Sequence, residues 1–183
     1  MPDESFDDFY RDDLTRLVAF LCKAGFGLEP AKDAANEVMT LAYKNWSSIR
    51  SPRAWVRKAA FRAAVKEAER TRTEAGRAAA SGWLVDSYVD IAGHAEVEEQ
   101  PTIKALLARL PPQQQQVMAW HLEDFRAGEI AEVMGLEPAT VRSHLRHARD
   151  ALRSIFEKSR SETAEATRCD TVVEEVPHHG SAE

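Results

Sequence analysis

The side chains with the clearest chemistry stand in the segment "PATVRSHLRHARDAL", where cations recur at helical spacing. Arg142, Arg146 and Arg149 lie three or four positions apart, with Ser143 and His147 beside them. Side chains at this spacing share one face of a helix. Guanidinium groups donate paired hydrogen bonds to phosphate oxygens or to the edge of a guanine. The segment therefore offers the side chains of a helix that contacts DNA.

The opposite face of the same segment is apolar. Val141, Leu145, Ala148 and Leu152 recur at helical steps. They predict one buried stripe beneath the exposed cations.

A shorter helix is expected just before this segment, over residues 127–134. Gly135 suits the left-handed residue that closes a helix, and Pro138 suits the first position of the next one. Ile130 and Met134 would face inward. Two helices joined by a glycine-containing turn, the second one basic, form the helix-turn-helix layout that places its second helix in the major groove.

Two other interpretations of these residues are weaker. A plain helical hairpin with a solvated basic face would not require the glycine, the proline and the apolar stripe to agree in position. A zinc site at His144 and His147 lacks a cysteine or carboxylate at suitable spacing. A site formed by Cys169, His178 and His179 is equally weakly supported, and we predict no metal and no cofactor.

All of the secondary-structure elements that we expect from the sequence are helices, so we predict an all-α fold class. Apolar residues at three- and four-residue steps predict helices and no convincing strand. The expected helices span 5–24, 30–46, 52–72, 101–109 and 112–122, in addition to the two above.

Charge is distributed unevenly over the 183 residues. The net charge is −6, yet residues 50–72 and 142–160 are basic while both ends of the chain are acidic. Two basic blocks favour binding to nucleic acid, although the net charge of the whole chain is negative. No apolar run could span a bilayer, and the acidic start is unlike a signal peptide, so we expect a cytoplasmic protein without membrane insertion.

The segment "IKALLARLPPQQQQVMAWHLEDFRAGEIAEVMGLEPATVRSHLRHARDALRSIF" closely resembles region 4 of bacterial sigma factors. The N-terminal helices ending in "SPRAWVRKAAFRAAVKEAERTR" look like region 2 of the compact extracytoplasmic-function sigma factors. The resemblance implies two small helical domains joined by a flexible linker. Region 2 would span 1–72, the linker 73–100 and region 4 101–160, followed by a disordered tail over 161–183.

The resemblance also implies a function. Such proteins bind core RNA polymerase and promoter DNA without making or breaking bonds, and an anti-sigma factor commonly controls them. Region 4 reads the −35 element and region 2 captures the −10 element. By the family's pattern, the −35 contacts would come from Arg142, Ser143, Arg146, His147 and Arg149.

Opened −10 DNA needs cations for phosphates and polar or flat groups for an unstacked base. The loop "NWSSIRS" matches the family's base-capture loop, and the implied −10 contacts are Asn45, Ser47, Ser48, Trp55, Arg57, Lys58 and Arg62. Core packing is an alternative role for Trp55, because it shares the apolar stripe of its helix. The implied polymerase contacts are Asn36, Met39, Thr40 and Tyr43.

The chain departs from the family at several of these positions. Asn36, Met39 and Thr40 replace an acid, a glutamine and an acid of the usual polymerase-binding helix. Phe61 replaces an arginine in the usual "ARN…D" pattern, with Arg62 and Lys66 in place of its asparagine and aspartate. These changes affect the expected polymerase affinity and −10 preference more than the fold.

Two other functions compete with a sigma factor. A stand-alone LuxR-like regulator would dimerise and bind DNA without polymerase, and a helical adaptor would bind only protein. An enzyme is not supported, because no phosphate-binding glycine loop, metal cluster or nucleophile–base pair is present, and no small-molecule substrate is implied.

Overall fold

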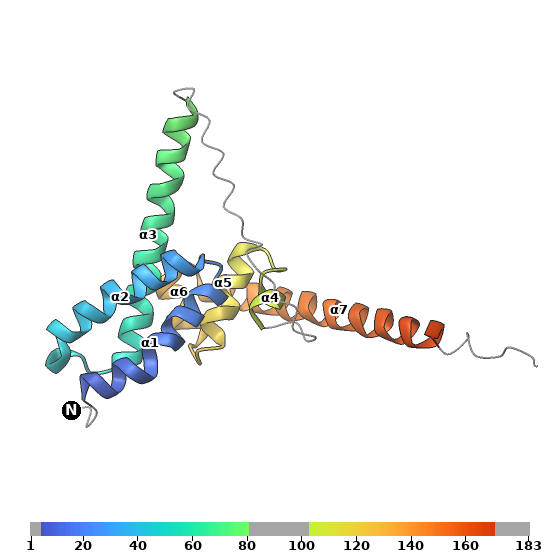
Figure 1. Ribbon diagram of the computed structural model, residues 1–183, viewed down its shortest axis with the longest axis horizontal. Helices are drawn as coiled ribbons and strands as arrows, with labels where there is room; N and C mark the ends of the chain where they lie inside the picture. Colours follow the sequence, from blue (N-terminus) through green and yellow to red (C-terminus); the bar gives the residue numbers. More distant parts are fainter. Residues whose placement is uncertain (1–4, 81–102, 171–183) are drawn as a thin grey trace, which may run out of the picture.

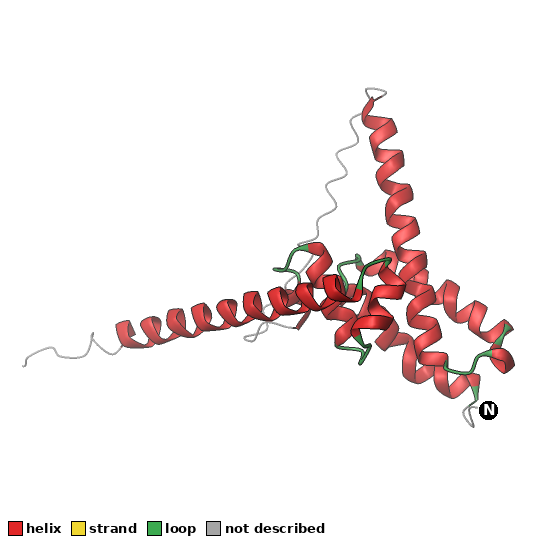
Figure 2. Ribbon diagram, turned by 180° about the vertical axis from the view of Figure 1, so that it is seen from behind, coloured by secondary structure: helices red, strands yellow, loops and turns green. Residues whose placement is uncertain are grey.

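The computed structural model describes residues 5–80 and 103–170, with side chains described over 5–74, 103–158 and at 160. These parts of the chain are helices joined by short turns, with no strand among them (Figures 1 and 2). The elements in chain order are α1 (Phe6–Lys23), α2 (Leu28–Lys44), the 3-10 turn η1 (Trp46–Ser48), α3 (Pro52–Ala80), α4 (Ile103–Leu107), α5 (Pro112–His121), α6 (Ala127–Met134) and α7 (Pro138–Asp170). The predicted all-α fold class is confirmed.

Helix boundaries follow the start and stop residues of the sequence. The Ser5 hydroxyl caps α1 by accepting a hydrogen bond from the backbone N–H of Asp8 at 3.3 Å. Pro52, Pro112 and Pro138 each occupy the first position of a helix, where the missing N–H costs nothing and the fixed φ angle favours the helical conformation.

The N-terminal unit is formed by α1, α2 and α3, which pack against one another. Leu17, Val38, Met39, Val56 and Ala60 are buried between them. Each residue lies on the apolar face of its own helix, where apolar residues recur every three or four positions. The apolar faces of the three helices together form one shared core.

The C-terminal unit is formed by α4 to α7. Leu107, Val117, Ile130, Val141 and Ala148 are buried in it. Its short helices have little apolar surface each, so their stability depends on packing against α7.

The two units share one hydrophobic core instead of forming separate bodies. Trp120 of α5 has no exposed surface, and its ring packs against Phe20 of α1 at 4.7 Å and Phe61 of α3 at 5.2 Å between centroids. Gln115 Nε2 donates to the carbonyl of Lys23 at 3.1 Å. The two small helical domains expected from the sequence thus also pack against each other through aromatic side chains.

The turn after α1 lies close against Gln115 of α5. Gly25 adopts φ +98°, and a Cβ there would lie 3.0 Å from Gln115 Oε1. A side chain at this position would meet both backbone strain and a clash with α5.

Two helices continue beyond the domain boundaries expected from the sequence. The helix α3 continues past residue 72 to Ala80, and α7 continues past residue 160 to Asp170. Alanine, glutamate and arginine are good helix formers that extend a helix without an apolar face. Both helix ends extend away from the body (Figure 1). Most of the predicted linker lies outside the described residues.

Within the described ranges, no helix combines the length and the apolar character needed to cross a membrane.

Candidate nucleic-acid interface

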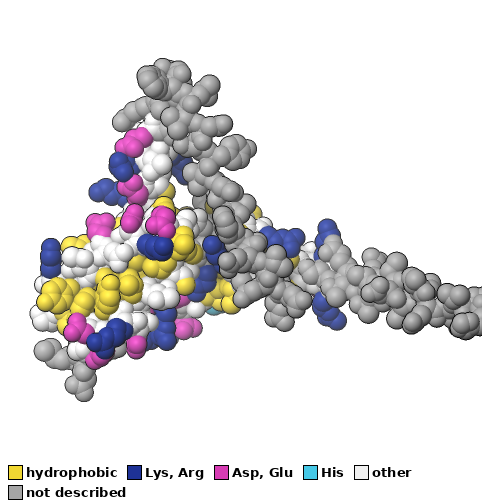
Figure 3. Space-filling view, in the orientation of Figure 1, with side chains coloured by type: hydrophobic (Ala, Val, Ile, Leu, Met, Phe, Trp, Pro, Cys, Tyr) yellow, Lys and Arg dark blue, Asp and Glu magenta, His cyan; other side chains and the backbone are white. Residues whose placement is uncertain are grey.

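The basic face predicted for the second helix of the pair lies on α7. Arg142, Arg146, His147 and Arg149 are exposed, and Ser143 is half-buried. Val141, Leu145 and Ala148 are buried on the opposite face. The structure thus brings the predicted −35 residues to one surface. Dark blue Lys and Arg side chains continue along α7 where it leaves the body (Figure 3).

The turn between α6 and α7 sets the angle at which this face is presented. Gly135 adopts the left-handed conformation, with φ +65° and ψ +36°. The backbone N–H of Leu136 donates to the carbonyl of Ala131 at 3.0 Å, which closes α6. At its other end, Glu129 accepts from the backbone N–H of Arg126 at 2.9 Å. Both ends of α6 are thus fixed, as a helix-turn-helix requires.

Two of the α7 cations contact histidines. Arg149 Nη2 lies 2.9 Å from His121 Nε2 of α5, and Arg146 Nη2 lies 3.4 Å from Nε2 of the adjacent His147. The first contact connects α7 to α5 across the C-terminal unit.

The predicted base-capture loop lies between α2 and α3. Asn45, Ser47 and Ser48 are exposed there. Asn45 Nδ2 donates to the carbonyl of Leu41 at 2.8 Å, and Ser48 Oγ donates to the carbonyl of Asn45 at 2.8 Å. These bonds hold η1 in shape and leave the side chains at the surface.

Trp55 and Trp46 are both partly buried against the core. The ring of Trp46 packs on Phe6 and Phe9, with centroids 5.3 and 5.0 Å apart. Core packing is therefore part of the role of Trp55, as its place in the apolar stripe predicted.

The structure separates the predicted −10 cations. Arg62 is exposed and Lys58 is half-buried, but Arg57 is only 5% exposed. Its Nη1 and Nη2 donate to the carboxylate of Asp13 at 2.5 and 3.1 Å, and its Nε donates to Glu123 at 2.6 Å. In this conformation the guanidinium of Arg57 is enclosed by carboxylates and is not exposed for contact with DNA.

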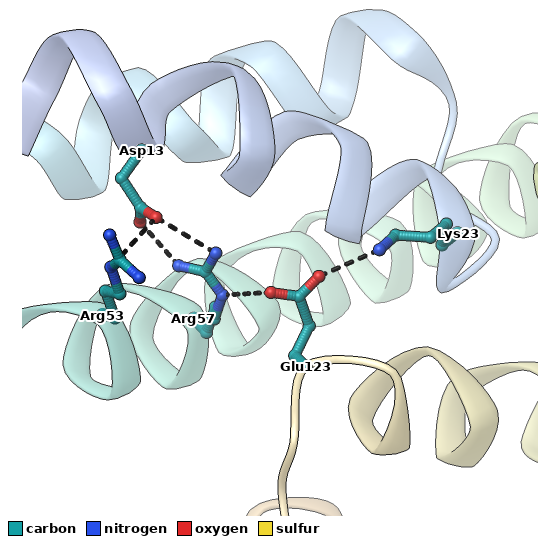
Figure 4. A network of polar contacts seen from close by, with 5 residues as sticks. All are labelled: Asp13, Lys23, Arg53, Arg57 and Glu123. Atoms are coloured by element: carbon teal, nitrogen blue, oxygen red, sulfur yellow. Dashed lines mark hydrogen bonds and ion pairs between the residues drawn. The ribbon is translucent and has the colours of Figure 1, made fainter.

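The carboxylate of Glu123 also accepts from Lys23 Nζ at 2.9 Å, and Arg53 Nε lies 3.9 Å from Asp13 (Figure 4). We call Asp13, Lys23, Arg53, Arg57 and Glu123 the interunit network, because it joins α1 and α3 to the loop after α5. Charges removed from water are stabilised only where partners of opposite sign surround them.

The pKa values in the network reflect this pairing. Burial opposes the charged form of Arg57, but hydrogen bonds to Asp13 and Glu123 outweigh it and raise its pKa. Burial likewise opposes ionisation of Glu123, and the bonds from Lys23 and Arg57 outweigh it and lower its pKa. Both groups therefore stay charged inside the interface.

Most of the predicted polymerase contacts lie on the exposed side of α2. Asn36, Thr40 and Tyr43 are exposed, whereas Met39 is 1% exposed within the core. Met39 is thus a packing residue in this conformation, unlike the other three predicted polymerase contacts. Hydrophobic side chains gather on the surface over α1 and α2 (Figure 3), where Tyr10, Leu41 and Tyr43 are exposed.

Sequence reasoning missed Asp13, Trp120 and Glu123. Asp13 falls in an acidic run that is typical of a solvated surface, and its burial depends on Arg57 from another helix. Phe61, which replaces the family's arginine, was the available signal for an apolar contact at this place. Its partner Trp120 could not be identified from spacing alone.

Comparisons with known proteins agree with the fold. The family model described as sigma-70, region 4, matches residues 102–152. No curated protein matches the chain in sequence.

Two solved structures are similar to the chain. The sigma factor RpoE of Bartonella quintana, in complex with the anti-sigma factor NepR, gives a TM-score of 0.60 at 18% identity, covering 83% of this chain and 96% of that one. CnrH, in complex with the cytosolic domain of CnrY, gives a TM-score of 0.51 at 15% identity, covering 84% and 88%.

Residues 102–152 are thus a sigma-70 region 4 domain, and the chain has the fold of the similar sigma factor structure. The family match covers residues 102–152, and the likeness to the two solved structures is one of fold.

Proposed function

We propose that the protein is a sigma factor that directs core RNA polymerase to specific promoters. The observation that carries this proposal is the region 4 match over 102–152, in which α7 presents Arg142, Arg146 and His147 on an exposed face. A helix of this kind fits the major groove, where arginine pairs with guanine. In this role, α7 reads the −35 element.

The N-terminal unit supplies the second promoter contact in this proposal. The exposed loop side chains of Asn45, Ser47 and Ser48 would meet the unstacked −10 bases, with Lys58 and Arg62 near the phosphates. The exposed side of α2, with Asn36, Thr40 and Tyr43, would contact core polymerase. We assign residues 1–72 to region 2, 73–100 to the linker and 101–160 to region 4.

An anti-sigma factor is the proposed regulator. The similar sigma factor RpoE forms a complex with the anti-sigma factor NepR, and the same fold offers comparable surfaces here. The protein would act in the cytoplasm, where polymerase and DNA are, by binding alone and without catalysis.

The test is transcription in vitro with purified core polymerase and genomic promoter fragments. We expect transcripts with defined start sites only when the protein is added. DNA binding without polymerase, together with no new start sites, would instead favour the LuxR-like regulator. Failure to bind either polymerase or DNA would favour the protein-binding adaptor.

A further inference from the structure

Arg149 of α7 is held by a histidine and by no carboxylate. Its Nη2 lies 2.9 Å from Nε2 of His121, the last residue of α5. Within residues 5–74 and 103–158, Arg149 takes part in no ion pair, whereas Arg153 one turn later pairs with Asp150 at 3.8 Å. The guanidinium of Arg149 is therefore held in place while its positive charge stays uncompensated.

The chemistry of the two groups determines which nitrogen of His121 carries a proton. A guanidinium has only donors, so Nε2 of His121 accepts the hydrogen bond from Arg149. A neutral imidazole that accepts at Nε2 carries its proton on Nδ1. No residue in the described part of the chain accepts a hydrogen bond from this Nδ1–H. His121 therefore offers a donor beside a cation.

Both groups lie at the face that meets DNA in the proposed function. Arg142, Arg146 and Arg149 are exposed on α7 at three- and four-residue steps, so they share one side of the helix. His121 is half-buried and comes from α5, so it adds a second element to this face. A guanidinium with unused N–H groups beside another N–H donor suits the oxygens of a phosphate.

We propose that His121 is a DNA-contacting residue of this face. Its Nε2 positions the guanidinium of Arg149, and its Nδ1–H joins that guanidinium in binding one phosphate of the −35 duplex. The inference rests on the proposed function, in which α7 reads the −35 element, and adds a contact from α5. A side chain that is already ordered loses less conformational entropy on binding. A neutral imidazole orders the arginine without cancelling its charge, as a carboxylate would.

The first measurement locates the proton of His121 in the full-length protein. Nitrogen–proton NMR spectra of the histidine-labelled chain distinguish an imidazole protonated at Nδ1 from one protonated at Nε2. The variant His121→Gln assigns the signal by its absence. We expect the proton at Nδ1, and we expect Arg149→Ala to abolish this preference. A proton at Nε2 in the wild-type protein would overturn the inference, whether or not the protein is a sigma factor.

The second measurement is the binding of polymerase reconstituted with each variant to a promoter duplex found in the transcription assay. Loss of one hydrogen bond to a charged group in His121→Ala predicts roughly tenfold weaker binding. The salt slope should stay unchanged, because a neutral imidazole releases no counterion, whereas Arg149→Ala should lower it by about 0.9. His121→Gln keeps both an acceptor and a donor, so it should restore most of the affinity.

Two further comparisons test whether both residues hold the same phosphate. His121→Ala/Arg149→Ala should bind as Arg149→Ala does. When single phosphates of the −35 duplex are replaced by uncharged methylphosphonates, one position should weaken binding of the wild type but not of Arg149→Ala. The matched control is Gln114→Ala, a half-buried residue of the same helix, which should bind like the wild type. Circular dichroism checks that each variant is helical.

Three binding results would overturn the inference: additive losses in the double variant, a loss from His121→Ala that depends on the base sequence, or an equal loss in Gln114→Ala. Failure of the sigma function gives a different result, namely no start sites with the wild-type protein in the transcription assay. The two failures are thus distinguishable.

Discussion

At the scale of single residues, two sets of arginines have different roles. Arg142 and Arg146 lie exposed on α7 and are positioned to meet DNA, whereas Arg57 is enclosed by carboxylates from two units. In the proposed function, the exposed arginines serve DNA recognition, whereas Arg57 joins the two units. The solvent exposure of each arginine and the side chains that pair with it distinguish the two groups. Neither the exposure nor the pairing can be identified from the residue type.

Replacing Arg142 or Arg146 with alanine should weaken binding to the preferred −35 sequence. If the guanidinium pairs with a base, we expect a loss of about 1–3 kcal/mol in binding free energy. The size of the loss should depend on which base stands at the contacted position of the DNA. Binding of duplex DNA by polymerase reconstituted with each variant measures this. A uniform loss across sequences, with a shallower salt slope, would show that the arginine contacts only phosphate.

Asp13→Asn should destabilise the molecule strongly. The carboxylate is 1% exposed and pairs with Arg57, so its removal leaves a buried guanidinium short of negative charge. We expect a loss of about 3–5 kcal/mol in the free energy of unfolding. Urea denaturation followed by circular dichroism measures it, with Asp8→Asn on the exposed side of α1 as the control. Equal stability of the two variants would contradict the structure.

The interunit contact should also weaken in acid through Glu123. Its pKa is lowered from 4.5 in the closed molecule, so its stabilising effect is complete above that value and is lost as the pH falls through the lowered one. Asp13, Lys23 and Arg57 surround it. Tryptophan fluorescence, to which the buried Trp120 contributes, follows opening in an acid titration. The stability difference between wild type and Glu123→Gln should shrink below pH 4.5. A difference that is constant with pH would contradict this role.

At the scale of elements, the sequence predicts helices well and their partners poorly. Pro52, Gly135 and Pro138 each specify a local boundary, and all three boundaries are confirmed. The spacing of the α7 stripe also predicts the exposed basic face. The burial of Met39 and Arg57 depends on contacts between helices that are far apart in the sequence. Such contacts cannot be predicted from the spacing of apolar residues along one helix.

Gly135→Ala should disturb the angle between α6 and α7. The residue adopts φ +65°, which costs an alanine about 1–2 kcal/mol, although a Cβ there meets no neighbouring atom within 4 Å. We expect lower thermal stability and weaker binding to −35 DNA. Gly128→Ala, in the first turn of α6 and also without nearby atoms, is the matched control. A similar effect of both substitutions would exclude a special role for the turn.

At the scale of the whole molecule, one closed body contains two proposed DNA-binding surfaces. Trp120, Phe61 and the interunit network hold the units together. The ends of α3 and α7 extend from this body (Figure 1).

The most direct test of the central claim is permanganate mapping of strand opening on a promoter fragment with core polymerase. Thymines of the −10 element should become reactive only when the protein is present, at a fixed distance from the duplex that α7 protects. Protection of the −35 element without polymerase, or protection with no opening downstream, would contradict the account.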